Sequence, residues 1–240
     1  MLLLANSIVD GFFKSNAIGQ GIVEVQLIGS VIMFAVAIWK IFTLSNVKVS
    51  LRRFFQDFST SQDSLEYYIT RRPTNATGLE LIYKNTAERL LKLISPDIRA
   101  QLAGRRGGVD SAALTAREIE LVRGTCEHTL EDEIIHVEKS MSIIATIVAL
   151  EPMLGLLGTV WGVLDAFAEM GTAGSANLAT IAPSISAALV TTVVGLIVAI
   201  PGVMLFNGIN GTIRDITNDM EGFADELMGR IACEFQGRGA

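Results

Sequence analysis

The 240-residue sequence predicts an all-α membrane protein with three transmembrane helices, long cytoplasmic extensions of those helices and a helical cytoplasmic domain. Two observations lead to this fold class. Hydrophobic residues make up 50% of the chain and charged residues only 18%, whereas soluble domains carry about 25% charged residues. In addition, three apolar runs are each long enough for a helix to cross the roughly 30 Å of membrane hydrocarbon.

The three apolar runs define three predicted spans, at residues 23–45, 139–168 and 178–207. The second and third spans form a hairpin, because only the polar turn 169–177 separates them. A cleaved signal peptide is the alternative for the first run, but its apolar core begins after about 24 residues and exceeds the usual 7–15. We therefore predict a retained helix, with Lys40 near its end extending its ammonium group to the interface.

The basic residues predict how the chain is oriented in the membrane. Sixteen of the 19 Lys and Arg residues lie between Lys14 and Lys139, and residues 140–213 contain none. Only Lys14 precedes the first span, so the basic middle segment is expected in the cytoplasm. The predicted compartments are periplasmic for residues 1–22 and cytoplasmic for the helical domain 46–138 and the helical tail 208–240.

The cytoplasmic segments show helical periodicity. Apolar residues recur at helical spacing in 79–94 and 114–137, and Pro and Gly residues mark the breaks around them, at Pro73, Pro96 and 104–108. From Ser111, a plausible N-cap, no strong breaker precedes Pro152, which predicts one helix of about 50 residues or more that enters the second span. Helical spacing in 210–234 predicts that the third span also continues into the cytoplasm.

Several function classes are disfavoured. The net charge of −6 and the scattered basic residues argue against a nucleic-acid partner. The chain has no phosphate-binding loop and no nucleophile elbow, so an enzyme is not expected and no cofactor is implied. One helical segment carries possible metal ligands, for which a solvated helix face is the better interpretation: Cys126, His128, Glu131, Asp132, Glu133 and His136.

Small and polar residues distinguish the hairpin from ordinary apolar spans. Gly155, Gly158 and Gly162 fall within about 60° on the helical wheel, which permits close helix approach. Polar residues in hydrocarbon tend to face a bundle interior or a pathway, and here they are Glu151, Thr159, Asp165, Ser184, Ser186, Thr191 and Thr192.

Thr159 and Thr192 lie at similar depth, each roughly 20 Å inward from the turn by helical rise. Two interpretations of these threonines remain equally open. Their hydroxyls face each other and bind water or a carboxylate from another chain, or each bonds the i−4 carbonyl of its own helix.

The hairpin sequence itself resembles a known family. Residues 154–167 read LGLLGTVWGVLDAF and residues 177–207 read NLATIAPSISAALVTTVVGLIVAIPGVMLFN. These motifs resemble the MotA/TolQ/ExbB proton-channel family, close to TolQ and ExbB. The resemblance implies a homo-pentamer in the bacterial inner membrane, embedded in the lipid bilayer, around a dimer of single-span TolR/ExbD-like partners. A TonB/TolA-like periplasm-spanning protein is a further partner that the resemblance allows.

The resemblance also implies roles for particular residues. Thr159 and Thr192 match the family's threonines that line the proton route beside the partner's essential aspartate. Pro183 and Pro201 match the prolines of the third span and shape it, and Gly195 joins the packing glycines there.

One position departs from the family. TolQ and ExbB usually carry a glutamate where this chain has Ala187. Glu151 is the available carboxyl, but by helical rise it lies about 30 Å from the turn, whereas Ala187 lies about 15 Å from it. Glu151 is therefore either an exit-side carboxylate of the proton pathway or, as the depth favours, an interfacial charge.

The predicted function is a subunit of a proton-motive-force-driven inner-membrane motor that couples proton flow to work on the outer membrane or envelope. The sequence leaves open whether the role is that of an ExbB-type transport energiser or a TolQ-type envelope and division protein. A solute permease subunit and a membrane scaffold are the alternatives from other classes. Three spans are few for a permease.

Overall fold

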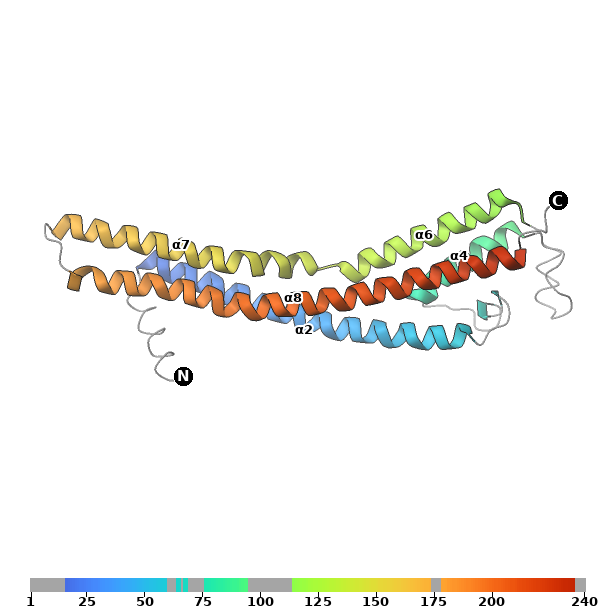
Figure 1. The fold of residues 1–240 in the computed structure, drawn as a ribbon, viewed down its shortest axis with the longest axis horizontal. Helices are drawn as coiled ribbons and strands as arrows, with labels where there is room; N and C mark the ends of the chain where they lie inside the picture. Colours follow the sequence, from blue (N-terminus) through green and yellow to red (C-terminus); the bar gives the residue numbers. More distant parts are fainter. Residues whose placement is uncertain are drawn as a thin grey trace. The chain divides into compact units, whose positions relative to one another are not determined.

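A computed structural model of the chain describes residues 16–59, 64–65, 67–68, 76–94, 114–173 and 178–235. The five helices in these ranges are α2 (Ala17–Ser59), α4 (Leu79–Leu93), α6 (Ala116–Glu138), α7 (Met141–Ala173) and α8 (Leu178–Phe235) (Figure 1). The described ranges contain no extended strand, and three helical segments are long and apolar enough to cross a membrane. The predicted fold class is confirmed.

The chain divides into two compact units. Unit 1 comprises Met1–Ile41 and Ser140–Asn210, and unit 2 comprises Phe42–Lys139 and Gly211–Ala240. Unit 1 therefore holds the first part of α2, all of α7 and the first part of α8, whereas unit 2 holds α4, α6 and the remaining parts of α2 and α8.

The two longest helices run through predicted span boundaries. α8 is continuous over 58 residues and includes Pro183 and Pro201, which confirms that the third span continues as a helix through the tail. α2 continues to Ser59, beyond the predicted end of the first span at residue 45. The Lys40 side chain does not extend outward as expected, because it is only 3% exposed.

The predicted single helix through α6 and α7 is wrong, because the chain leaves the helical conformation between them (Figure 1). α6 ends at Glu138, Lys139 has an extended ψ of 139°, and Ser140 has a φ of 74°. A positive φ interrupts the helical hydrogen-bond ladder. Neither Gly nor Pro stands at this point, so composition does not reveal the break.

A capping box begins α6. The predicted N-cap, Ser111, lies outside the described residues, and the described N-cap is Thr115. Its hydroxyl accepts a hydrogen bond from the Glu118 N–H, while the Glu118 carboxylate accepts one from the Thr115 N–H at 2.8 Å. This backbone bond holds the pKa of Glu118 below its ordinary value.

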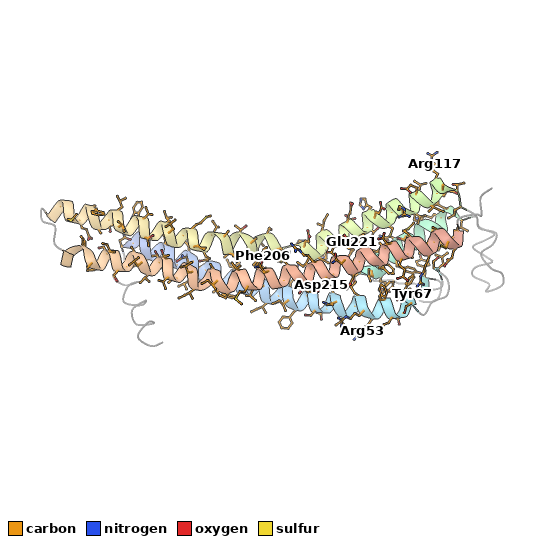
Figure 2. The ribbon with its side chains drawn as sticks, in the orientation of Figure 1. Arg53, Tyr67, Arg117, Phe206, Asp215 and Glu221 are labelled. Atoms are coloured by element: carbon orange, nitrogen blue, oxygen red, sulfur yellow. The ribbon has the colours of Figure 1, made fainter. Side chains whose placement is uncertain are left out.

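An aromatic cluster forms the core of unit 2. The Phe223 ring of α8 packs edge-on against Phe54 and Phe58 of α2, with ring centroids 5.4 and 5.2 Å away. Tyr67 and Tyr83 join the same cluster, and burial raises the pKa of Tyr83 above its usual range. In Figure 2, by contrast, the exposed arginines Arg53 and Arg117 point away from the helices that carry them.

Replacing Phe223 by alanine should strongly destabilise the protein. The ring is fully buried, so its removal leaves a cavity that costs about 3–5 kcal/mol. Thermal unfolding in detergent should show a melting temperature lower by roughly 6–20 °C. The control is Glu221→Ala on the exposed face of α8, which should leave the melting temperature unchanged. Equal melting temperatures for the two variants would contradict the aromatic core.

Candidate ion pathway in unit 1

Three glycines of α7 bring that helix into close contact with α8. A Cβ atom on Gly155 would lie only 2.8 Å from the Thr192 Cα. A Cβ on Gly158 would overlap the side chain of Thr191, and one on Gly162 would overlap another side chain of α8. These positions therefore have no room for any side chain at the present helix separation.

The threonines of the hairpin hydrogen-bond to main-chain carbonyls in two different ways. The Thr192 hydroxyl donates across to the Gly155 carbonyl of α7 at 2.8 Å, and the Thr191 hydroxyl reaches the same carbonyl at 3.1 Å. The Thr159 hydroxyl instead donates to Leu156 of its own helix at 2.8 Å. Thr159 thus bonds the i−3 carbonyl of its own helix, and Thr192 bonds a main-chain carbonyl of the facing helix, an arrangement that neither interpretation of the sequence described.

A buried glutamine of α2 joins all three helices of unit 1. Gln26 is 0% exposed, and its Nε2 donates to the carbonyl of Glu151 on α7 at 3.1 Å and to that of Thr191 on α8 at 3.3 Å. Gln26 is not among the predicted site residues, although an amide inside the first apolar run was a usable signal.

The Glu151 carboxyl group lies in the interior of unit 1. Its side chain is 1% exposed, and its Oε2 atom has no hydrogen-bond partner among the residues that the structure describes. The same holds for Gln26 Oε1. An interfacial charge, which the depth argument favours, would instead reach toward water.

Glycines on α2 and α8 make room for these two polar side chains. A Cβ on Gly29 would lie 2.7 Å from Glu151 Oε1. A Cβ on Gly195 would lie 2.7 Å from Gln26 Nε2 and 2.5 Å from the Glu151 carbonyl oxygen. The two glycines that allow close helix packing here are therefore also the ones that contact the buried polar residues Gln26 and Glu151.

A polar cavity of about 140 Å³ lies between the helices of unit 1 on the side of Asp165. The Asn16 amide donates to Asp165 Oδ2 at 2.9 Å, and the Ser184 hydroxyl donates to Glu169 Oε2 at 3.0 Å. Besides these polar groups, its wall includes Thr191 and Ala187.

The structure does not bring the possible metal ligands of α6 together. Cys126 is buried, and its burial raises the thiol pKa. His128 is largely exposed and lies 3.1 Å from Asp132. Among the residues that the structure describes, no three His, Cys, Asp or Glu side chains gather in a metal-binding arrangement.

Known proteins support the assignment that the hairpin motifs suggest. Residues 98–222 match the MotA/TolQ/ExbB proton channel family. The Tol-Pal system protein TolQ of Haemophilus influenzae is 30% identical over 223 residues, which cover 91% of each chain. The biopolymer transport protein ExbB of Neisseria gonorrhoeae is 40% identical over 91 residues, covering 38% of this chain and 41% of its own.

The fold, the glycine-packed hairpin and these similarities define one class of protein: the chain belongs to the MotA/TolQ/ExbB proton channel family. The resemblance inferred from the hairpin motifs is thereby confirmed. Relatives named TolQ and relatives named ExbB both match, so the similarities do not separate the two roles.

Gly158→Ala should destabilise unit 1. The added Cβ would lie 2.6 Å from the Thr191 Cβ, and overpacking of this kind costs about 1–3 kcal/mol. Gly171→Ala on the same helix is the matched control, because a Cβ at that position would have no neighbouring atom within 4 Å. Thermal unfolding in detergent should show a lower melting temperature for the first variant only. A control that melts as early as Gly158→Ala would argue against the tight helix contact.

Proposed function

We propose that this chain is the pore-wall subunit of a proton-motive-force-driven motor in the bacterial inner membrane, which couples proton flow to work on the outer membrane or envelope. The observation that carries the proposal is the glycine-packed contact between α7 and α8. It holds the Thr192 hydroxyl against the Gly155 carbonyl within the segment matching the proton channel family.

In this proposal Thr159, Thr192 and Glu151 belong to the proton pathway. A threonine hydroxyl donates and accepts hydrogen bonds but does not hold a proton charge at neutral pH. A carboxylate must therefore supply the titrating group beside Thr159 and Thr192, and the TolR/ExbD-like partner supplies it. The glycines and the two prolines of α8 shape the wall against which that partner moves.

The outward surface of unit 1 supports an oligomer in lipid. Large apolar side chains are exposed along all three helices, including Val31 on α2, Leu156 on α7 and Met204 on α8. Five copies around a partner dimer would bury part of this surface and leave the rest to lipid. The proposed orientation places the N-terminus in the periplasm and the C-terminus in the cytoplasm, following the basic residues.

The client of the motor is either a transport system, as the name of the ExbB relatives suggests, or the Tol-Pal envelope system, as the name of the TolQ relatives suggests. A TonB/TolA-like protein that spans the periplasm would carry the motion outward in either case.

Native mass spectrometry of the detergent-extracted chain tests the assembly. The chain is expressed with and without a single-span TolR/ExbD-like protein from the same genome. Five copies that retain two copies of the partner are expected. A monomer, or an assembly that never binds the partner, would contradict the motor and favour the solute permease or scaffold alternatives.

Thr192→Val should reduce proton conduction by the complex about tenfold, because valine keeps the shape of threonine but cannot hydrogen-bond. Thr192→Ser keeps the hydroxyl and should conduct nearly as well as the native chain. Proton uptake into vesicles that contain the chain and its partner, followed with a pH-sensitive dye, measures both variants. A scaffold role predicts no difference between valine and serine, provided that assembly is intact.

A further inference from the structure

The buried pair Gln26 and Glu151 has an unbalanced set of hydrogen-bonding groups. Both N–H groups of the Gln26 amide are directed to helix carbonyls, those of Glu151 and Thr191. This fixes the orientation of the amide, because the flipped form would set its oxygen against two other oxygens. Only Oε1 of Gln26 remains, and it is an acceptor.

The second atom without a partner is also an oxygen. Glu151 Oε2 and Gln26 Oε1 both lack a hydrogen-bond donor among the described residues, although both side chains are at least 99% buried. A buried ionised carboxylate without donors is very unfavourable. One proton removes the conflict, because it neutralises Glu151 and turns one of its acceptor oxygens into an O–H donor.

No fixed charge in the described structure takes the place of that proton. Gly29 of α2 lies against the Glu151 carboxyl, whereas Gln26 of α2 and Gly195 of α8 lie against the main-chain carbonyl of Glu151, and none of the three titrates. Glu24 is exposed on α2. The remaining charged side chains of the described part of unit 1 stand further along the helices: Lys40 on α2, and Asp165 and Glu169 on α7. Asp165 lies roughly 21 Å from Glu151 by helical rise.

The polar cavity extends from Thr191 toward the end of unit 1 that bears Asp165 and Glu169, and neither Gln26 nor Glu151 lines it. Its wall includes Thr191, whose main-chain carbonyl accepts a hydrogen bond from Gln26. Two carboxyl groups stand along the cavity, each holding one hydrogen bond from a neighbour. Ala187 carries only a methyl group at the cavity wall.

We propose that Glu151 and Gln26 form a proton-binding site inside the protomer, and that protons reach it through the cavity beside Asp165 and Glu169. The bound species is a single proton on the Glu151 carboxyl. This site lies next to the threonines of α8, because Gln26 Nε2 also donates to the Thr191 carbonyl. It rests on the proposed function only in taking the proton as the ion.

Carbodiimide labelling tests the bound proton. Dicyclohexylcarbodiimide enters membranes, and the O–H of a protonated carboxyl adds across one of its C=N bonds to form an O-acylisourea, whereas ionised carboxylates and amides do not react. The full-length chain in lipid vesicles is treated over a range of pH, and the modified peptide is sequenced by mass spectrometry. Label should appear on Glu151 at low pH, decline as the pH rises, and be absent from Glu151→Gln.

Two results of this labelling would overturn the site. One is the absence of label on Glu151 at every pH while exposed carboxyl groups of the same chain react. The other is protection of Glu151 by Na⁺ but not by K⁺ at constant pH, which would identify a sodium site instead of a proton site. Label that depends on pH and not on Na⁺ supports the proposal.

The entry route is tested by filling the cavity. Ala187→Leu adds a side chain to the cavity wall, whereas Val193→Leu adds one methylene on the exposed face of α8. After a jump from high to low pH, Glu151 should become reactive at least about tenfold more slowly in Ala187→Leu than in the native chain. Val193→Leu should match the native rate. Equal rates in all three chains would exclude the cavity as the route.

These readouts do not need the partner protein, so the inference and the proposed function can fail separately. A complex that conducts protons while Glu151 never binds one would contradict the proton-binding site but not the proposed motor function. If Glu151 titrates but the chain conducts no protons together with its partner, the proposed motor function is contradicted and the proton-binding site is not.

Discussion

The close approach of α7 to α2 and α8 is the constraint on which the rest of unit 1 depends. Helices in lipid gain little from apolar burial, so they associate where small residues let their backbones meet. At Gly155 and Gly195 no side chain fits between the helices. That approach brings the Gly155 carbonyl within reach of the α8 threonines and lets one amide, Gln26, bridge α7 and α8.

Polar groups in this setting are either satisfied by the backbone or available for function. The Thr192 hydroxyl and the Gln26 amide nitrogen bond main-chain carbonyls, which stabilises the packed helices. Glu151 Oε2 and Gln26 Oε1 have no such partner among the described residues. Burial of unpaired oxygens costs stability, and proteins retain such groups mainly where they bind a ligand or an ion.

The fold class was predictable because long apolar runs and helical spacing are strong, local signals. The interruption at Ser140 was not, because its positive φ occurs without Gly or Pro. The hairpin motifs identified the family and located Thr159 and Thr192. The involvement of Gln26 depends on which face of α2 meets α7, and the burial of Glu151 depends on the same contact. The depth of Glu151 along its own helix does not show which helix faces meet, and depth alone therefore favoured an interfacial charge.

A measurement of proton conduction with each chain alone and with both chains together tests the central claim most directly. Vesicles are prepared with this chain alone, with the TolR/ExbD-like partner alone, and with both, and a proton gradient is imposed across each. The account predicts proton uptake above the lipid background only where both chains are present, because this chain forms the wall and the partner carries the titrating carboxylate. Uptake by this chain alone, or none by the assembled complex, would contradict it.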